Sequence, residues 1–129
     1  MLLDDAVNVT PEVVQEGIRI RWLISEKEDA PNFAMRVIEL DPGVVFDPHH
    51  HPYEHEIYVL EGSGVVTGPE GDVGALAPGR FLLVKPDEIH GYRNTGEATL
   101  RFICVIPLQA QSMTHAAKSD KKTLRSGTT

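Results

Sequence analysis

Short apolar segments recur along the chain, and turn residues separate them. In residues 18–24, isoleucine or tryptophan stands at every second position. A period of two is typical of a β-strand that buries one face. Other segments rich in Val, Ile, Leu and Phe end at Gly, Pro, Asn or Asp, which favour turns. The pattern predicts strands at Ile18–Ile24, Phe33–Leu40, Ile57–Leu60, Val65–Thr67, Val73–Leu76, Phe81–Val84, His90–Arg93 and Thr99–Ile106.

Many short strands joined by regular turns, without a long amphipathic helix, predict an all-β sandwich or barrel. One helical turn is expected near the start, where Thr10 could cap a helix that begins at Pro11 and covers residues 12–16. Residues 110–129 are polar, mostly small or basic, with little to bury. We therefore expect one domain over residues 1–109 and a flexible tail over 110–129.

The charge is unevenly spread along the 129 residues, whose formal net charge is −7. Residues 110–129 hold four basic residues and one acidic residue, so the excess of negative charge lies before them. An acidic body argues against nucleic acid as the main partner, because phosphate binding needs clustered lysine and arginine. The charge itself indicates no more than solubility.

Cysteine content and apolar stretches bear on the compartment. The single cysteine, Cys104, excludes an intramolecular disulfide, and its apolar neighbours predict a buried thiol that packs as a small hydrophobe. The first residues lack the basic start and long apolar core of a secretory signal. No apolar stretch approaches the ~20 residues that span a bilayer. We expect a cytoplasmic protein without membrane contact.

Four of the six histidines lie within residues 49–55, and His90 follows downstream. Side chains two apart on a strand share a face, so His49 and His51 form a natural pair, and His55 can join them if the extended backbone continues. Neutral imidazole is a common ligand of first-row transition metals. The cluster therefore predicts a metal site.

The spacing around these histidines resembles that of the cupin family. The first block reads Gly43-x5-His49-x-His51-x3-His55-x6-Gly62, against the family's G-x5-H-x-H-x3,4-E-x6-G. The second reads Gly79-x5-Lys85-x-Asp87-x2-His90-x3-Asn94, against G-x5-P-x-G-x2-H-x3-N, with Lys85 and Asp87 departing at turn positions. The resemblance covers about residues 30–107. It implies a double-stranded β-helix, that is, a jelly-roll barrel of two antiparallel sheets.

His55 stands where most cupins have a ligand glutamate. The chain is similar to small manganese-type cupins with four histidine ligands, and the carry-over by position gives His49, His51, His55 and His90. The resemblance favours manganese, although imidazole also suits Fe, Ni, Co, Zn and Cu. It also implies a homodimer, for which the strand Ile18–Ile24 with Trp22 could supply an edge.

Strand alternation gives the same ligand set. It places His55 on one face and Glu54 and Glu56 on the other, so the two glutamates should point away. The alternative is that one of them is a ligand through an irregular strand start after Pro52. His50 is out of phase with its neighbours, which predicts a residue at the surface or behind the ligands.

Four neutral ligands leave the charge of a divalent ion uncompensated, and an octahedral ion would keep two adjacent open positions. This favours a small anionic oxygenated ligand. The chain could be a dioxygenase, isomerase or lyase of the cupin kind, or a non-catalytic sensor or carrier that binds metal and a small molecule. A third alternative is a barrel in which metal serves only stability. No sequence feature identifies a substrate.

Two further residues are candidates for catalysis or ligand binding. Tyr92 shares a strand face with His90, so it could line the pocket or pack in the core. Arg36 lies in the apolar strand 33–40, where a charge needs a reason. We expect Arg36 to be an exposed edge residue, with a clamp for a substrate carboxylate as the alternative.

Overall fold

The structure, a computed structural model, describes residues 1–108 and is built almost entirely from strands. The predicted tail, residues 110–129, lies outside the described residues. No helix within residues 1–108 is long and apolar enough to cross a membrane. The elements in chain order are η1 (Ala6–Asn8), β1 (Glu12–Gln15), β2 (Ile18–Ile24), η2 (Glu26–Glu28), β3 (Phe33–Leu40), β4 (Val45–His49), β5 (His55–Glu61), β6 (Gly64–Gly68), β7 (Gly71–Leu76), β8 (Phe81–Val84), β9 (His90–Asn94) and β10 (Leu100–Pro107).

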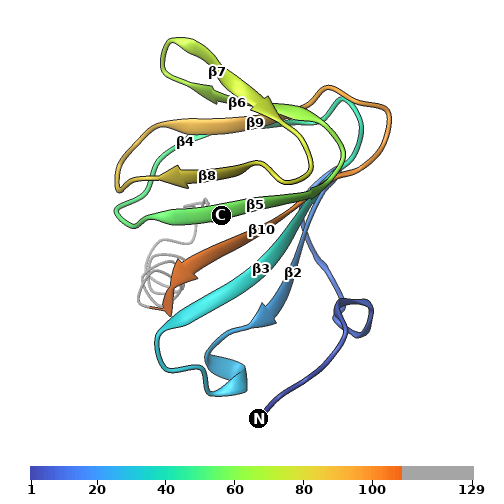
Figure 1. Cartoon of the computed structure of the whole chain (residues 1–129), viewed down its shortest axis with the longest axis vertical. Helices are drawn as coiled ribbons and strands as arrows, with labels where there is room; N and C mark the ends of the chain where they lie inside the picture. Colours follow the sequence, from blue (N-terminus) through green and yellow to red (C-terminus); the bar gives the residue numbers. More distant parts are fainter. Residues whose placement is uncertain (109–129) are drawn as a thin grey trace.

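The strands form two antiparallel sheets. One has six strands in the order β1-β2-β3-β10-β5-β8, and the other has four in the order β4-β9-β6-β7. The four-stranded sheet occupies the upper part of Figure 1, and β2, β3, β10 and β5 run below it. The all-β expectation is confirmed. Each predicted strand is present, three of them (β2, β3 and β8) with the predicted bounds.

The inner faces of the two sheets enclose one apolar core. Alternation is clearest in β10, where Leu100, Phe102, Cys104 and Ile106 are buried and the residues between them are half-buried. The ring of Phe102 packs against Tyr92 from the opposite sheet, with ring centroids 5.0 Å apart. Burial of such large apolar side chains is the main favourable term in folding.

Asn94 ties the end of β9 to the six-stranded sheet. Its side-chain amide donates to the carbonyls of Leu40 and Ala98, each at 2.9 Å, and its Oδ1 accepts the backbone N–H of Gly96 at 2.9 Å. The side chain is 2% exposed and has its bonds made within the fold. The asparagine at the end of the second sequence motif therefore has a structural role.

The expected helical turn over residues 12–16 is wrong, because Glu12–Gln15 is the edge strand β1. It pairs antiparallel with β2, with Val13 opposite Arg19. The adjacent β-branched residues Val13 and Val14 suit a strand, and the edge of β2 that faces away from β3 supplies the backbone partners. Consequently β2 lies between β1 and β3. The homodimer expectation had required β2 to be an edge strand, and it is not one.

Candidate metal centre

The four predicted histidines come from both sheets and one loop. His49 ends β4 and His90 begins β9, and the two are paired across the four-stranded sheet. His55 begins β5 of the six-stranded sheet, and His51 lies in the connection between β4 and β5. The site therefore lies between the two sheets, at the end of β4 and the starts of β5 and β9.

An irregularity in β4 brings His49 opposite His90. Phe46 pairs with Tyr92 and His49 with His90, so three steps on β4 match two on β9. Pro48 lies inside this bulge and has no N–H to donate to a ladder. Gly91 faces it, where an added Cβ would lie 2.7 Å from the Phe46 carbonyl oxygen. The close approach of the two strands at this point depends on that glycine.

Three of the histidines form a compact donor group. One ring nitrogen each from His49, His51 and His90 lies within 4.8 Å of the others, so the group could hold a metal ion. His55 is outside this trio but adjoins it, with Nε2 2.9 Å from Nε2 of His51. Its ring lies 4.2 Å from that of His51 and 5.4 Å from that of His90, between centroids.

The outer nitrogens of these rings have partners that leave Nε2 facing inward. Nδ1 of His49 lies 2.9 Å from the carbonyl oxygen of Asp47, and Nδ1 of His90 lies 2.8 Å from that of Glu88. A carbonyl only accepts, so each Nδ1 carries the proton and each Nε2 keeps its lone pair. Nδ1 of His55 lies 3.1 Å from Sγ of Cys104. Such outer partners orient ligand imidazoles in metal sites.

The Nε2 atom of His90 is buried and has no hydrogen-bond partner among the described residues. A buried lone pair without a partner costs free energy that a bound cation would recover. Burial lowers the pKa of His90 to about 4, and burial together with the nearby Arg36 charge lowers that of His55. Both rings are neutral at pH 7, the form that ligates metal. The donor set fits a divalent ion.

The predicted alternation of faces is confirmed. His51, His55 and Ile57 are buried, whereas Glu54 and Glu56 are exposed. The alternative glutamate ligand gains no support, because both carboxylates lie on the exposed face of the chain, away from the buried histidines.

His50 is on the surface, as predicted. Its side chain is 60% exposed, and its Nδ1 lies 3.9 Å from a carboxylate oxygen of Asp87. It therefore provides a natural control for its two neighbours.

Tyr92 lies in the aromatic core beside the histidines. Its ring contacts those of Phe46 and His90, each at a centroid distance of 5.8 Å, and it is 1% exposed. Burial raises the pKa of Tyr92, and the neighbouring Cys104 adds to this effect, so the phenol keeps its proton.

Arg36 is buried, so the expectation of an exposed edge residue is wrong. It is 1% exposed and sits on the inner face of β3, between Trp22 on β2 and Cys104 on β10. Its Nη2 lies 3.0 Å from Sγ of Cys104, the sulfur that also contacts His55. Sequence reasoning placed Cys104 in the core but missed this polar bridge, because alternation indicates a face and not the partners across it.

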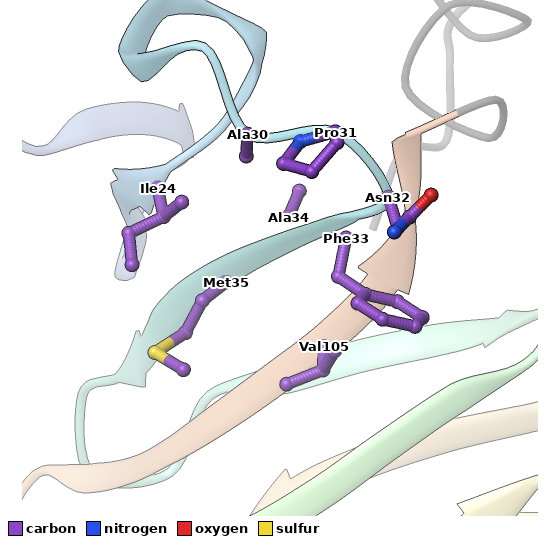
Figure 2. A pocket seen from close by; sticks show the side chains of 8 residues that line it. All are labelled: Ile24, Ala30, Pro31, Asn32, Phe33, Ala34, Met35 and Val105. Atoms are coloured by element: carbon purple, nitrogen blue, oxygen red, sulfur yellow. The ribbon is translucent and has the colours of Figure 1, made fainter. Parts of the chain in front are cut away.

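A separate pocket of about 320 Å³ lies beside the segment that joins β2 to β3 (Figure 2). Its lining contains no histidine and no charged side chain, which suits apolar contact and not metal chemistry. The lining residues are Ile24, Ala30, Pro31, Asn32, Phe33, Ala34, Met35 and Val105.

Comparison with known proteins agrees with this fold. Residues 36–106, more than half of the chain, match the family model described as "Cupin domain". The chain therefore belongs to the cupin family, and its two sheets form the double-stranded β-helix of that family.

The matched proteins include enzymes. The chain is 29% identical over 103 residues to an L-ectoine synthase of Mycolicibacterium vanbaalenii, covering 79% of this chain and 77% of that protein. It is 31% identical to the polyketide cyclase RemF of Streptomyces resistomycificus, with a TM-score of 0.78 over 84% of this chain and 80% of the other. An ectoine synthase of P. lautus, at 16% identity and a TM-score of 0.74, covers 92% of this chain and 86% of its own and shares the fold.

Proposed function

We propose that this cupin binds one divalent metal ion through His49, His51, His55 and His90 and presents it to a small anionic oxygenated ligand. The observation that carries the proposal is the buried Nε2 of His90, which has no partner within residues 1–108 and adjoins ring nitrogens of His49 and His51. The 2.9 Å approach of His55 to His51 supports His55 as the fourth ligand. The resemblance to manganese-type cupins makes manganese the first metal to test.

The chemistry of the donors sets the ligand class. When bound, a divalent ion supplies Lewis acidity toward an oxygen atom of the ligand. The four imidazoles contribute no negative charge, and the buried Arg36 adds a positive one. The two exposed glutamates, Glu54 and Glu56, lie outside the site and do not offset it. The site therefore favours a carboxylate or a deprotonated hydroxyl.

We infer a reaction of the lyase or isomerase kind in preference to a dioxygenase reaction. Two of the proteins that the chain resembles are a synthase and a cyclase by name, and neither name refers to oxygen. The Tyr92 ring lies beside His90, so its phenol is the first candidate for a proton donor. The alternative is a non-catalytic sensor or carrier, which binds the same metal and ligand but does not convert the ligand.

Metal analysis of a matched pair of variants tests the proposal. His51→Ala should lower the metal content to less than about a tenth of wild type, because it removes one of the three donors that lie together. His50→Ala should leave the content unchanged, because its side chain is exposed. Equal metal in His51→Ala and wild type would refute the assignment.

Oxygen consumption separates the reaction classes. Metal-loaded protein should consume no oxygen with 2-oxo acids or hydroxy acids that bind to it, as expected for a lyase, an isomerase or a binding protein. Oxygen uptake that depends on one of these acids, and that is absent in His51→Ala, would favour the dioxygenase instead.

We also propose a homodimer, as the resemblance implies. The outer face of the six-stranded sheet exposes Tyr58 on β5 and, paired with it, Phe81 on the edge strand β8, which is 83% exposed. Exposed apolar patches of this kind mark interaction surfaces. Phe81→Glu should shift the mass in light scattering from dimer to monomer, whereas Val73→Glu, at an exposed position on β7, should not. A monomeric wild type at micromolar concentration would refute the dimer.

A further inference from the structure

Arg36 is a buried cation inside the barrel. It lies on the inward face of β3, opposite Trp22 in one neighbouring strand and opposite Cys104 in the other. Its side chain is 1% exposed, so water does not solvate it. A guanidinium group keeps its charge at all pH values that proteins tolerate. The fold therefore holds a permanent positive charge in its interior.

The neighbours of Arg36 do not neutralise this charge. Among residues 1–108, its one side-chain hydrogen bond is from Nη2 to Sγ of Cys104, at 3.0 Å, and its Nε is buried without a partner. The Trp22 ring faces the guanidinium with its centroid 5.2 Å away. None of the ion pairs in the described part of the chain involves Arg36. A thiol is a weak acceptor, and an aromatic face carries no net charge.

Cys104 links Arg36 to the histidines. The Cys104 sulfur lies 3.0 Å from Arg36 Nη2 and 3.1 Å from His55 Nδ1. The charge of Arg36 and the ring of His55 are thus separated by a single atom of a third residue. Any ligand bound at the histidines lies in the electrostatic field of Arg36.

The shape of the unpartnered group indicates the kind of anion. The Nε–H and the adjoining Nη–H of a guanidinium are parallel donors that match the two oxygens of a carboxylate. Burying such a group costs free energy unless an anion pairs with it, and its unpaired Nε adds to the cost. We propose that Arg36 binds a carboxylate group of the ligand whose other oxygen functions lie at the histidines, an inference that rests on the proposed function.

Calorimetric titration with simple dicarboxylates tests this assignment. Oxalate, malonate, succinate and glutarate span different distances, and the monomethyl ester of the tightest binder removes one charge. Wild type should bind the diacid about tenfold to a hundredfold more tightly than the monoester, as expected for a charge-assisted bidentate pair. In Arg36→Gln this preference should disappear, whereas Arg93→Gln, an exposed arginine on β9, should keep it.

Two other measurements separate this inference from the proposed function and from a structural role. Arg36→Gln should keep the metal content of wild type and melt at the same temperature or higher, because it removes a buried charge without a counter-ion. Unchanged preference for the diacid in Arg36→Gln would overturn the assignment, and so would a large loss of stability, which would mark a structural partner of Cys104. The titration is repeated on chelator-treated protein. If wild type holds no metal, the proposed function fails. In that case a preference for the diacid that depends on Arg36 still supports the carboxylate site. The absence of that preference overturns the carboxylate site.

Discussion

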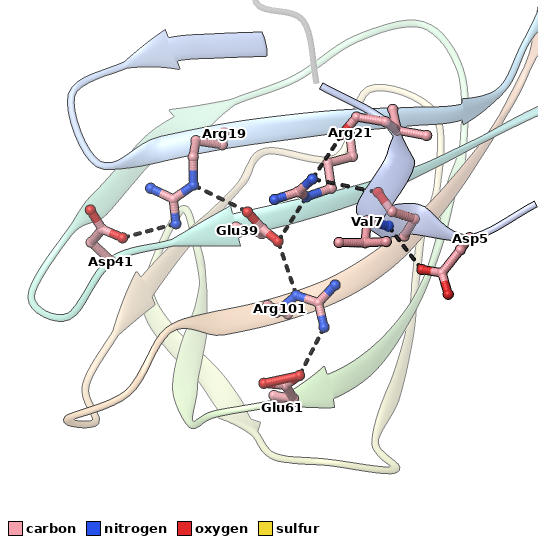
Figure 3. A network of polar contacts seen from close by, with 10 residues as sticks. Asp5, Val7, Arg19, Arg21, Glu39, Asp41, Glu61 and Arg101 are labelled. Atoms are coloured by element: carbon pink, nitrogen blue, oxygen red, sulfur yellow. Dashed lines mark hydrogen bonds and ion pairs between the residues drawn. The ribbon is translucent and has the colours of Figure 1, made fainter. Parts of the chain in front are cut away.

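Glu39 and Arg36 lie three residues apart on β3, on opposite faces, and both are buried. The surroundings of Glu39 satisfy its charge: Arg19, Arg21 and Arg101 contact its two oxygens at 3.0–3.2 Å (Figure 3). Arg36 has no carboxylate beside it within residues 1–108. Charges that are satisfied within the fold serve stability. A buried charge without a partner is costly to maintain and points to a ligand.

The pKa values of Glu39 and His90 differ in the same way. Burial alone would raise the pKa of Glu39, yet hydrogen bonds from Arg101, Arg19 and Arg21 hold it below its ordinary value. At the histidine centre burial prevails, and it lowers the pKa of His90 to about 4. The outer cluster, Glu39 with its three arginines, is therefore built around an ionised group. The inner cluster, the four histidines, is built around neutral donors.

Removal of Glu39 should have the largest effect on stability. Glu39→Ala leaves three guanidinium groups without their common acceptor, and we expect a loss of about 3 kcal/mol in the free energy of unfolding. Glu61→Ala is the control, because Glu61 is largely exposed and pairs with Arg101 alone, so it should cost less than about 1 kcal/mol. Urea denaturation measures both, and equal losses would mean that the outer cluster is not organised around Glu39.

Acid should separate the two clusters by pH. Because the folded pKa of His90 is below its unfolded value of 6.5, the unfolded chain binds more protons between pH 6.5 and about 4. Stability of chelator-treated protein should therefore fall as pH falls through this window, by on the order of 3 kcal/mol for His90 alone. His55, shifted in the same direction, should add to the loss.

The outer cluster should respond only at the acid end of this window and below it. The folded pKa of Glu39 is lowered from 4.5, so its contribution is present above pH 4.5 and is lost as pH falls through the folded value. In chemical denaturation at a series of pH values, the free energy of unfolding of His90→Gln should depend less on pH in the upper window. That of Glu39→Gln should depend less on pH in the lower one. A His90→Gln variant that keeps the full upper slope would contradict the assignment.

Metal removal should destabilise the protein through the inner cluster alone. An ion that binds only the folded chain, and whose free concentration is about 100 times its dissociation constant, stabilises the fold by about 2.7 kcal/mol. Chelation at pH 7 should therefore lower Tm by about 10 °C. The same treatment should leave Tm of His51→Ala unchanged. Calorimetry decides this, and identical Tm values of wild type with and without chelator would show that the histidines bind no metal.

The smallest expected effect on stability comes from replacing single arginines. Arg101 pairs with carboxylates on neighbouring strands, whereas Arg36 has no carboxylate partner. Arg101 donates to Glu39 at 3.0 Å and to Glu61 at 2.8 Å, so Arg101→Gln should cost about 1 kcal/mol. Arg36→Gln should cost nothing or stabilise, because its charge has no counter-ion. The two variants can be measured side by side in urea, and a loss for Arg36→Gln as large as that for Arg101→Gln would remove the distinction between the clusters.

Some of this arrangement was predictable from local pattern. The alternation of faces from His49 to Val59 holds through the connection before β5, so it separated His51 and His55 from Glu54 and His50. Turn residues bounded the strands well, because a strand ends where glycine, proline or asparagine bends the chain. By contrast, local propensity suggested a helical turn at residues 12–16, and pairing with β2 made it a strand.

The sequence by itself determined eight of the ten strands and the buried face that His51 shares with His55, because these features depend on near neighbours along the chain. Only the tertiary structure decided that Arg36 points inward, that Cys104 bridges it to His55, and that three arginines meet at Glu39. Arg36 and Cys104 are 68 positions apart, and their contact depends on the register between β3 and β10. Register follows from the packing of all strands together, so no segment encodes it alone.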